Sequence, residues 1–137
     1  MKRYLIAALL IVMAGAAEAA PRQIVTDAAR RPNVPARLLH GIVMAESRYQ
    51  CGAYNRRTGA SGIGQVLPST ARSVGVYGNL LDCHNGIEAA AGYLHAALER
   101  ARGDWGGAAT LYNRGLGASP SHSGYSNHVM QFAMGDK

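Results

Sequence analysis

Apolar residues recur at helical spacing along most of this chain, and the alternation typical of β-strands is almost absent. In the segment 35–49, Leu38, Leu39, Ile42 and Val43 form one apolar stripe, and a second stripe runs through 87–102. A helix with one apolar stripe buries that stripe against other elements. The pattern therefore predicts a mainly α globular domain of about six helices.

Start and stop signals give approximate bounds for these helices. Pro32 and Pro35 separate the first helix from the second, Asn85 and Glu88 resemble a capping box before the longest helix, and Asp104 fits the cap of the next one. The expected helices cover residues 23–31, 35–49, 68 to about 74, 87–102, 104–112 and 125–134.

The first nineteen residues are expected to be a secretory signal peptide, because they do not resemble part of a folded domain. Lys2 and Arg3 give a positive start, residues 4–16 are apolar and uncharged, and residues 17–19 (Ala-Glu-Ala) fit the small-x-small pattern before a cleavage site. The apolar run is short for a membrane span, and no other segment could be one. Removing 19 of the 137 residues leaves 118, which suits one domain at 20–137.

The charge balance favours an anionic polymer as partner. Cleavage after residue 19 would remove two basic residues and one acidic residue, which leaves 12 basic and 7 acidic residues and a net charge of +5. Apart from Lys137, all the remaining basic residues are arginines. They are scattered, without the interleaved aromatic residues of a single-strand binder, so an envelope glycan is favoured over nucleic acid.

Cys51 and Cys83 are expected to form a disulfide, since an even cysteine count after a signal peptide usually means pairing. A catalytic cysteine–histidine pair is the weaker alternative, because no local signature selects one of the five histidines. A zinc site is also disfavoured, because neither Cys-x2-Cys nor His-Glu-x-x-His occurs.

Three features could carry chemistry. Glu46 follows the stripe of Leu39, Ile42 and Val43 on the same helix face, where partial desolvation would favour a protonated carboxyl able to act as a general acid. Alternatively, Glu46 lies at the stripe edge and reaches solvent or pairs with Arg48 or a later arginine.

The second feature is the segment 59–65 (Gly-Ala-Ser-Gly-Ile-Gly-Gln), within a non-periodic stretch that predicts a loop with at most a tiny hairpin. Its spacing fits neither nucleotide-binding fingerprint, and it could be an ordinary surface loop. The third is Tyr112-Asn113, a pair suited to stacking on and hydrogen-bonding a sugar. Tyr112 could equally be a core residue and Asn113 a helix C-terminal cap.

Taken together and in this order, the motifs from about Pro35 to Phe132 resemble those of lytic transglycosylase catalytic domains, the family related to the soluble muramidase and goose-type lysozyme. That family carries Glu-Ser after an apolar helix, Gly-Ala-x-Gly-Leu-Met-Gln, Pro-x-Thr-Ala, a helix ending in Tyr-Leu, Ala-Tyr-Asn and a late tyrosine. The corresponding residues are Glu46-Ser47, 59–65, Pro68-Ser69-Thr70-Ala71, Tyr93-Leu94, Leu111-Tyr112-Asn113 and Tyr125. Gly64 replaces the usual methionine, which would remove one wall contact with the sugar, and Leu111 replaces a small alanine.

The resemblance implies a lysozyme-like fold and cleavage of the β-1,4 bond between N-acetylmuramic acid and N-acetylglucosamine, with a 1,6-anhydromuramyl product. Glu46 would act as the general acid and then the base, as the family's single catalytic carboxylate. The glycan would be positioned by Ser47, Ser61, Gln65, Tyr112, Asn113 and Tyr125. No cofactor or metal is expected. Two rival interpretations are a hydrolase on the same fold and a non-catalytic glycan-binding assembly factor.

The resemblance also implies a location and partners. Peptidoglycan strands are the expected substrate, and the protein is expected to be exported to the periplasm or cell envelope as a monomer. The small size and the lack of extra domains resemble the specialised subgroup that accompanies secretion and conjugation machines, which is an analogy only.

Overall fold

The computed structural model describes residues 20–135, and within them the chain is almost entirely helix and loop. Residues 20–28 form the first helix. The other helices are α2 (Ala36–Ser47), α3 (Pro68–Ser73), α4 (Cys83–Arg100), α5 (Trp105–Arg114) and α6 (Gly124–Met134). Isolated antiparallel bridges join Ser61 to Tyr54 and to Val66. The predicted mainly α domain of about six helices with a tiny hairpin is confirmed.

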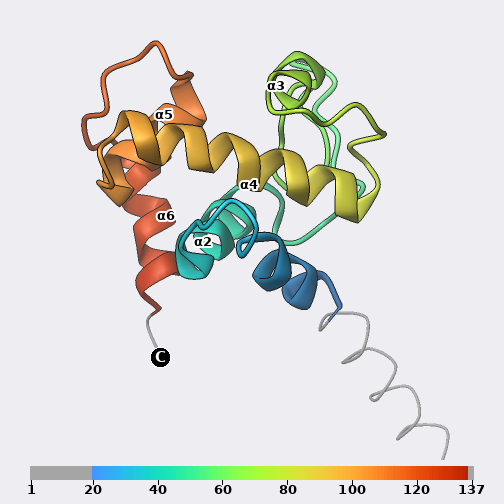
Figure 1. Cartoon of the computed structure of the whole chain (residues 1–137), viewed down its shortest axis with the longest axis horizontal. Coiled ribbons are helices and arrows are strands. Elements are labelled where there is room, and N and C mark those ends of the chain that lie inside the picture. The colour runs from blue at the N-terminus through green and yellow to red at the C-terminus, as the bar shows by residue number, and fades with distance from the viewer. Residues whose placement is uncertain (1–19, 136–137) are drawn as a thin grey trace, which may run out of the picture.

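The helices are arranged around α4, which is the longest (Figure 1). The α3 helix and the loop at residues 51–65, which we call the glycine-rich loop, lie near one end of α4, and α5 lies near the other. The α2 helix packs most extensively against α6, and α4 packs against α5. The core consists of apolar side chains from all of these helices, with Leu39, Ile42, Ile87, Leu94 and Leu111 among those almost fully removed from solvent.

Two helices end earlier than predicted, and α2 does so because the backbone adopts left-handed conformations at its end. Arg48 and Tyr49 have φ angles of 52° and 65°, so α2 ends at Ser47 and not at Tyr49. The first helix ends at residue 28 instead of 31. Asn33, with φ of 54°, turns the chain so that the Val34 amide donates to the Ala29 carbonyl at 3.0 Å.

The cap predicted for α4 is wrong, whereas the cap predicted for α5 is confirmed. Asp82, not Asn85, caps α4, and its carboxylate accepts hydrogen bonds from the amides of His84 and Asn85. The helix therefore starts at Cys83, one turn before the predicted Ile87. Asp104 caps α5 by accepting from the Gly107 amide.

The predicted disulfide between Cys51 and Cys83 is present, with a Cα–Cα distance of 5.0 Å. It joins the beginning of the glycine-rich loop to the first residue of α4. A bridge between cysteines that lie 32 positions apart stabilises a domain by about 3 to 4 kcal/mol on the chain-entropy estimate.

The signal peptide predicted at 1–19 lies outside the described residues. Among residues 20–135, no helix has both the length and the apolar character needed to cross a membrane.

Candidate active site

Glu46 lies in the last turn of α2 and ends the predicted apolar stripe. Leu39, Ile42 and Val43 are fully buried, as the spacing predicts, and Glu46 itself is partly buried. Within the described residues, Glu46 forms no ion pair, so the alternative of an arginine partner is not observed. Burial disfavours the ionised form and raises the pKa of the Glu46 carboxyl above its ordinary value.

Tyr125 in α6 is the hydrogen-bond partner of Glu46. Its hydroxyl donates to the Glu46 carboxylate at 2.5 Å across 79 positions of sequence. This bond favours the carboxylate and partly opposes the effect of burial on the pKa of Glu46. Burial and the neighbouring Glu46 charge raise the pKa of Tyr125 far above its usual range, so the phenol remains a donor.

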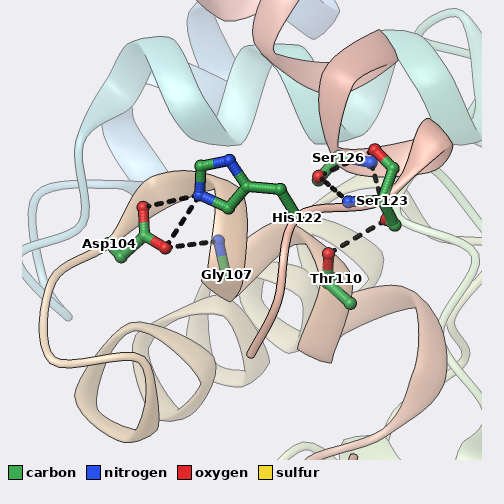
Figure 2. Close-up of polar contacts among 6 residues, drawn as sticks. All are labelled: Asp104, Gly107, Thr110, His122, Ser123 and Ser126. Atoms are coloured by element: carbon green, nitrogen blue, oxygen red, sulfur yellow. Dashed lines mark hydrogen bonds and ion pairs between the residues drawn. The ribbon is translucent and has the colours of Figure 1, made fainter. Parts of the chain in front are cut away.

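A polar cluster before α6 positions Tyr125, which is the second residue of that helix (Figure 2). Ser123 and Ser126 form a reciprocal capping box, and the Ser123 hydroxyl also contacts that of the buried Thr110 at 3.0 Å. His122 contacts the carboxylate of Asp104, the residue that caps α5. The start of α6 is thereby attached to α5.

Three consecutive carbonyls of the glycine-rich loop accept hydrogen bonds from side chains. The side-chain amide of Gln65 donates to the Gly62 carbonyl at 3.0 Å, and the Ser47 hydroxyl donates to the Ile63 carbonyl at 2.6 Å. The Tyr112 hydroxyl donates to the carbonyl of Gly64 at 2.7 Å. The loop is therefore fixed by α2, by α5 and by its own glutamine.

A pocket of about 410 Å³ opens beside Glu46, and we call it the Glu46 pocket. Among residues 20–135, Glu46 is the only acidic residue that lines it. The lining residues are Glu46, Asn55, Thr58, Ala60, Gln65, Val66, Leu67, Thr70, Tyr93, Tyr112, Asn113, Arg114 and Gly115. Segments far apart in sequence thus meet at one carboxylate.

Three of the predicted glycan-positioning residues, Gln65, Tyr112 and Asn113, line the Glu46 pocket, and Tyr125 reaches Glu46 directly. Ser47 and Ser61 are buried and do not line it; the Ser61 hydroxyl donates to the Gly59 carbonyl.

Sequence reasoning missed several lining residues. Tyr93 entered the sequence analysis only as part of a motif. Its partly buried position on α4 is the feature that could have predicted it as a lining residue of the pocket. Asn55 and Thr58 lie in a loop without periodicity, so no sequence signal pointed to them. Arg114 directly follows Tyr112-Asn113, the pair predicted to contact a sugar, and that adjacency could have identified it.

Gly64 does not line the Glu46 pocket. A Cβ atom at this position would lie 2.8 Å from the Tyr112 hydroxyl and still closer to the Cβ of Ala90. The space that a side chain would need is therefore filled by α4 and by the hydroxyl that binds the Gly64 carbonyl. Leu111, the other departure from the family pattern, is fully buried in the core.

A larger hollow of about 570 Å³ lies between residues 20–28 and α4, but it lacks a desolvated acid. Its carboxylates are exposed and paired: Asp27 contacts Arg30, and Glu88 contacts Arg31 at 3.4 Å. Glu88 is therefore not the capping residue that the sequence suggested. Within residues 20–135, no group of three or more His, Cys, Asp or Glu side chains could hold a metal ion.

The comparison with known families agrees with the motifs. The family model described as the Transglycosylase SLT domain matches residues 23–132, which include α2 to α5 and most of α6. The matched span covers most of the chain and contains Glu46, the glycine-rich loop, Tyr112 and Tyr125. The chain therefore belongs to the Transglycosylase SLT domain family, the lytic transglycosylase family that acts on peptidoglycan, and the identification made from its motifs is confirmed.

Proposed function

We propose that this protein is a peptidoglycan lytic transglycosylase that cleaves the β-1,4 bond between N-acetylmuramic acid and N-acetylglucosamine, with Glu46 as its acid and base. The observation that carries the proposal is the single partly buried carboxylate in the Glu46 pocket, hydrogen-bonded to Tyr125 and with a raised pKa. Most glycosidases use two carboxylates across the scissile bond. A pocket with one acidic residue suits a reaction in which the substrate supplies the other groups.

In the first step, the protonated Glu46 gives its proton to the glycosidic oxygen while the bond from that oxygen to the anomeric carbon breaks. The N-acetyl group of the substrate assists at the anomeric carbon. In the second step, the Glu46 carboxylate takes the proton of the muramic 6-hydroxyl, and that oxygen bonds to the anomeric carbon in place of the assisting N-acetyl oxygen, whose bond to that carbon breaks. The acid is restored, no water is consumed, and a 1,6-anhydromuramyl end results.

The products distinguish this reaction from hydrolysis on the same fold. Purified sacculi digested with the protein are expected to release anhydro-muropeptides, which are lighter than hydrolysed muropeptides by the mass of one water. Mass spectrometry of the digest checks this. Products that all carry a reducing end would show a hydrolase, and an intact sacculus with bound protein would show a glycan-binding factor.

The pH dependence of cleavage should report the Glu46–Tyr125 contact. The first step needs a protonated Glu46, so activity should fall as pH rises through its pKa, which burial has raised. Tyr125→Phe removes the hydrogen bond that lowers this pKa, so the basic limb should move to higher pH. The measurement is a pH profile of kcat/KM on soluble glycan strands.

The matched control for this profile is Tyr77→Phe, since Tyr77 is 78% exposed and does not line the Glu46 pocket. Its basic limb should coincide with that of the unaltered protein. A limb in Tyr125→Phe that stays in place or moves to lower pH would contradict the assigned role of the contact.

Membership of a peptidoglycan-acting family indicates an envelope location. We further propose that residues 1–19 are an export signal and that residues 20–137 are the exported domain, which acts in the periplasm. The charges and apolar run of the leader support this, as does the Cys51–Cys83 disulfide, because such bonds persist in oxidising compartments. A monomer that serves an envelope-spanning secretion or conjugation apparatus is part of the same proposal and rests on analogy with a specialised subgroup of the family.

A further inference from the structure

The Glu46 pocket carries one arginine, which the proposed mechanism does not use. Arg114 is the last residue of α5, its side chain is exposed, and it lines the pocket beside Asn113. Within residues 20–135, no carboxylate forms an ion pair with it. A guanidinium stays charged at all physiological pH values and binds carboxylates through two parallel hydrogen bonds.

A purely local role does not account for the position of Arg114 in the pocket. A basic residue in the last turn of a helix interacts favourably with the helix dipole. Arg100 holds the same position in α4 and is also exposed, yet it does not line the pocket. The difference between the two arginines is therefore what each one faces, and Arg114 faces the space in which a glycan would lie.

The surroundings of the pocket add to the positive charge. Asn55 and Thr58 also line it, and between them lie Arg56 and Arg57, both exposed. Glu46 is the only acidic residue among residues 20–135 that lines the pocket, and the proposed mechanism requires it to be protonated when the substrate binds. The pocket is then positive, and this attracts anionic ligands.

We propose, on the basis of the proposed function, that Arg114 binds a carboxylate carried by the lactyl substituent of muramic acid, and so makes the enzyme selective for anionic glycan strands. This carboxylate has two possible sources. In strands without peptides, the lactyl group itself ends in a free carboxylate. In strands with peptides, that carboxyl is an amide, and the carboxylates belong to the stem peptide.

The test is equilibrium binding to four kinds of soluble glycan strand, with every protein compared, the otherwise unaltered one included, carrying Glu46→Gln so that the strands are not cleaved. Two kinds are peptide-bearing strands and strands from which an amidase has removed the peptides. The other two are the same strands after their carboxylates have been converted to neutral amides. Arg114→Gln is expected to weaken binding to charged strands by on the order of tenfold or more, because a charge-assisted contact is lost. It should leave binding to the neutral strands unchanged.

Two further variants complete the design. Arg100→Gln removes the same charge from the same helical position and should bind all four strands as the unaltered protein does. Arg114→Lys keeps the charge without the paired hydrogen bonds and should lose less affinity than Arg114→Gln. Thermal unfolding of each variant checks that the fold is retained.

The pattern of losses also identifies the source of the carboxylate. A loss on peptide-free strands assigns it to the lactyl group, and a loss confined to peptide-bearing strands assigns it to the stem peptide. Equal weakening on charged and neutral strands, equal losses in Arg114→Gln and Arg100→Gln, or no loss at all would overturn the proposal. Because the readout is binding, these outcomes remain distinct from failure to form anhydro products.

Discussion

Replacement of Glu46 by glutamine is expected to lower glycan cleavage by on the order of 10³-fold or more, because in the proposed mechanism this one residue serves as both acid and base. The amide has the size of the carboxyl, but it cannot give the proton and then take it back. Its oxygen can still accept the hydrogen bond from Tyr125, so the fold and its stability should be kept. The release of soluble muropeptides from purified sacculi measures the effect.

The matched control for this substitution is Glu99→Gln, which makes the same chemical change at an exposed site in α4, away from the Glu46 pocket. It should cleave as the unaltered protein does. Unchanged turnover by Glu46→Gln, with protein free of contaminating active enzyme, would remove Glu46 from the mechanism.

Replacement of Gly64 by alanine is expected to lower the free energy of unfolding by about 2 to 3 kcal/mol through overpacking. The new Cβ would press on Ala90, whose short side chain can move only with the α4 backbone, and on the Tyr112 hydroxyl. Methionine, the residue usual in the family, should be worse because it is larger. Denaturant unfolding gives the stability, and cleavage should fall too because Gln65 and Tyr112 line the pocket.

Gly117→Ala is the control for this prediction. A Cβ at Gly117 would meet no atom within 4 Å, and its φ angle is not positive. The stability of this variant should stay close to that of the unaltered protein. If Gly64→Ala and Gly117→Ala were equally stable, the close packing of Gly64 against α4 would not limit what this position can hold.

The helices were predictable where a local signal was strong. The stripe before Glu46 is buried as its spacing predicts, and Asp104 caps α5 as its position suggests. The start of α4 was not predictable in this way, because Asp82 and Asn85 are both good capping residues and lie three positions apart. Because α4 starts at Cys83, that cysteine forms the disulfide with Cys51. A local sequence pattern does not contain this long-range bond and so could not indicate where the helix starts.

The site was predictable only in part, for a similar reason. The desolvation of Glu46 follows from its own helix, so the direction of its pKa shift could be foreseen. Its contact with Tyr125 depends on how α2 packs against α6, and no spacing within either helix encodes that packing. Ser47 fits the family motif, yet its hydroxyl binds the Ile63 carbonyl, which only the folded loop shows.

The three bound carbonyls of the glycine-rich loop determine when that loop becomes ordered. Glycines lose more conformational entropy than other residues when the backbone is fixed, so a free loop with Gly59, Gly62 and Gly64 would weaken glycan binding by ordering on contact. Here Gln65, Ser47 and Tyr112 hold the carbonyls of residues 62–64 within the fold itself. The entropy is therefore lost during folding, and the loop forms an ordered wall of the Glu46 pocket before any ligand binds.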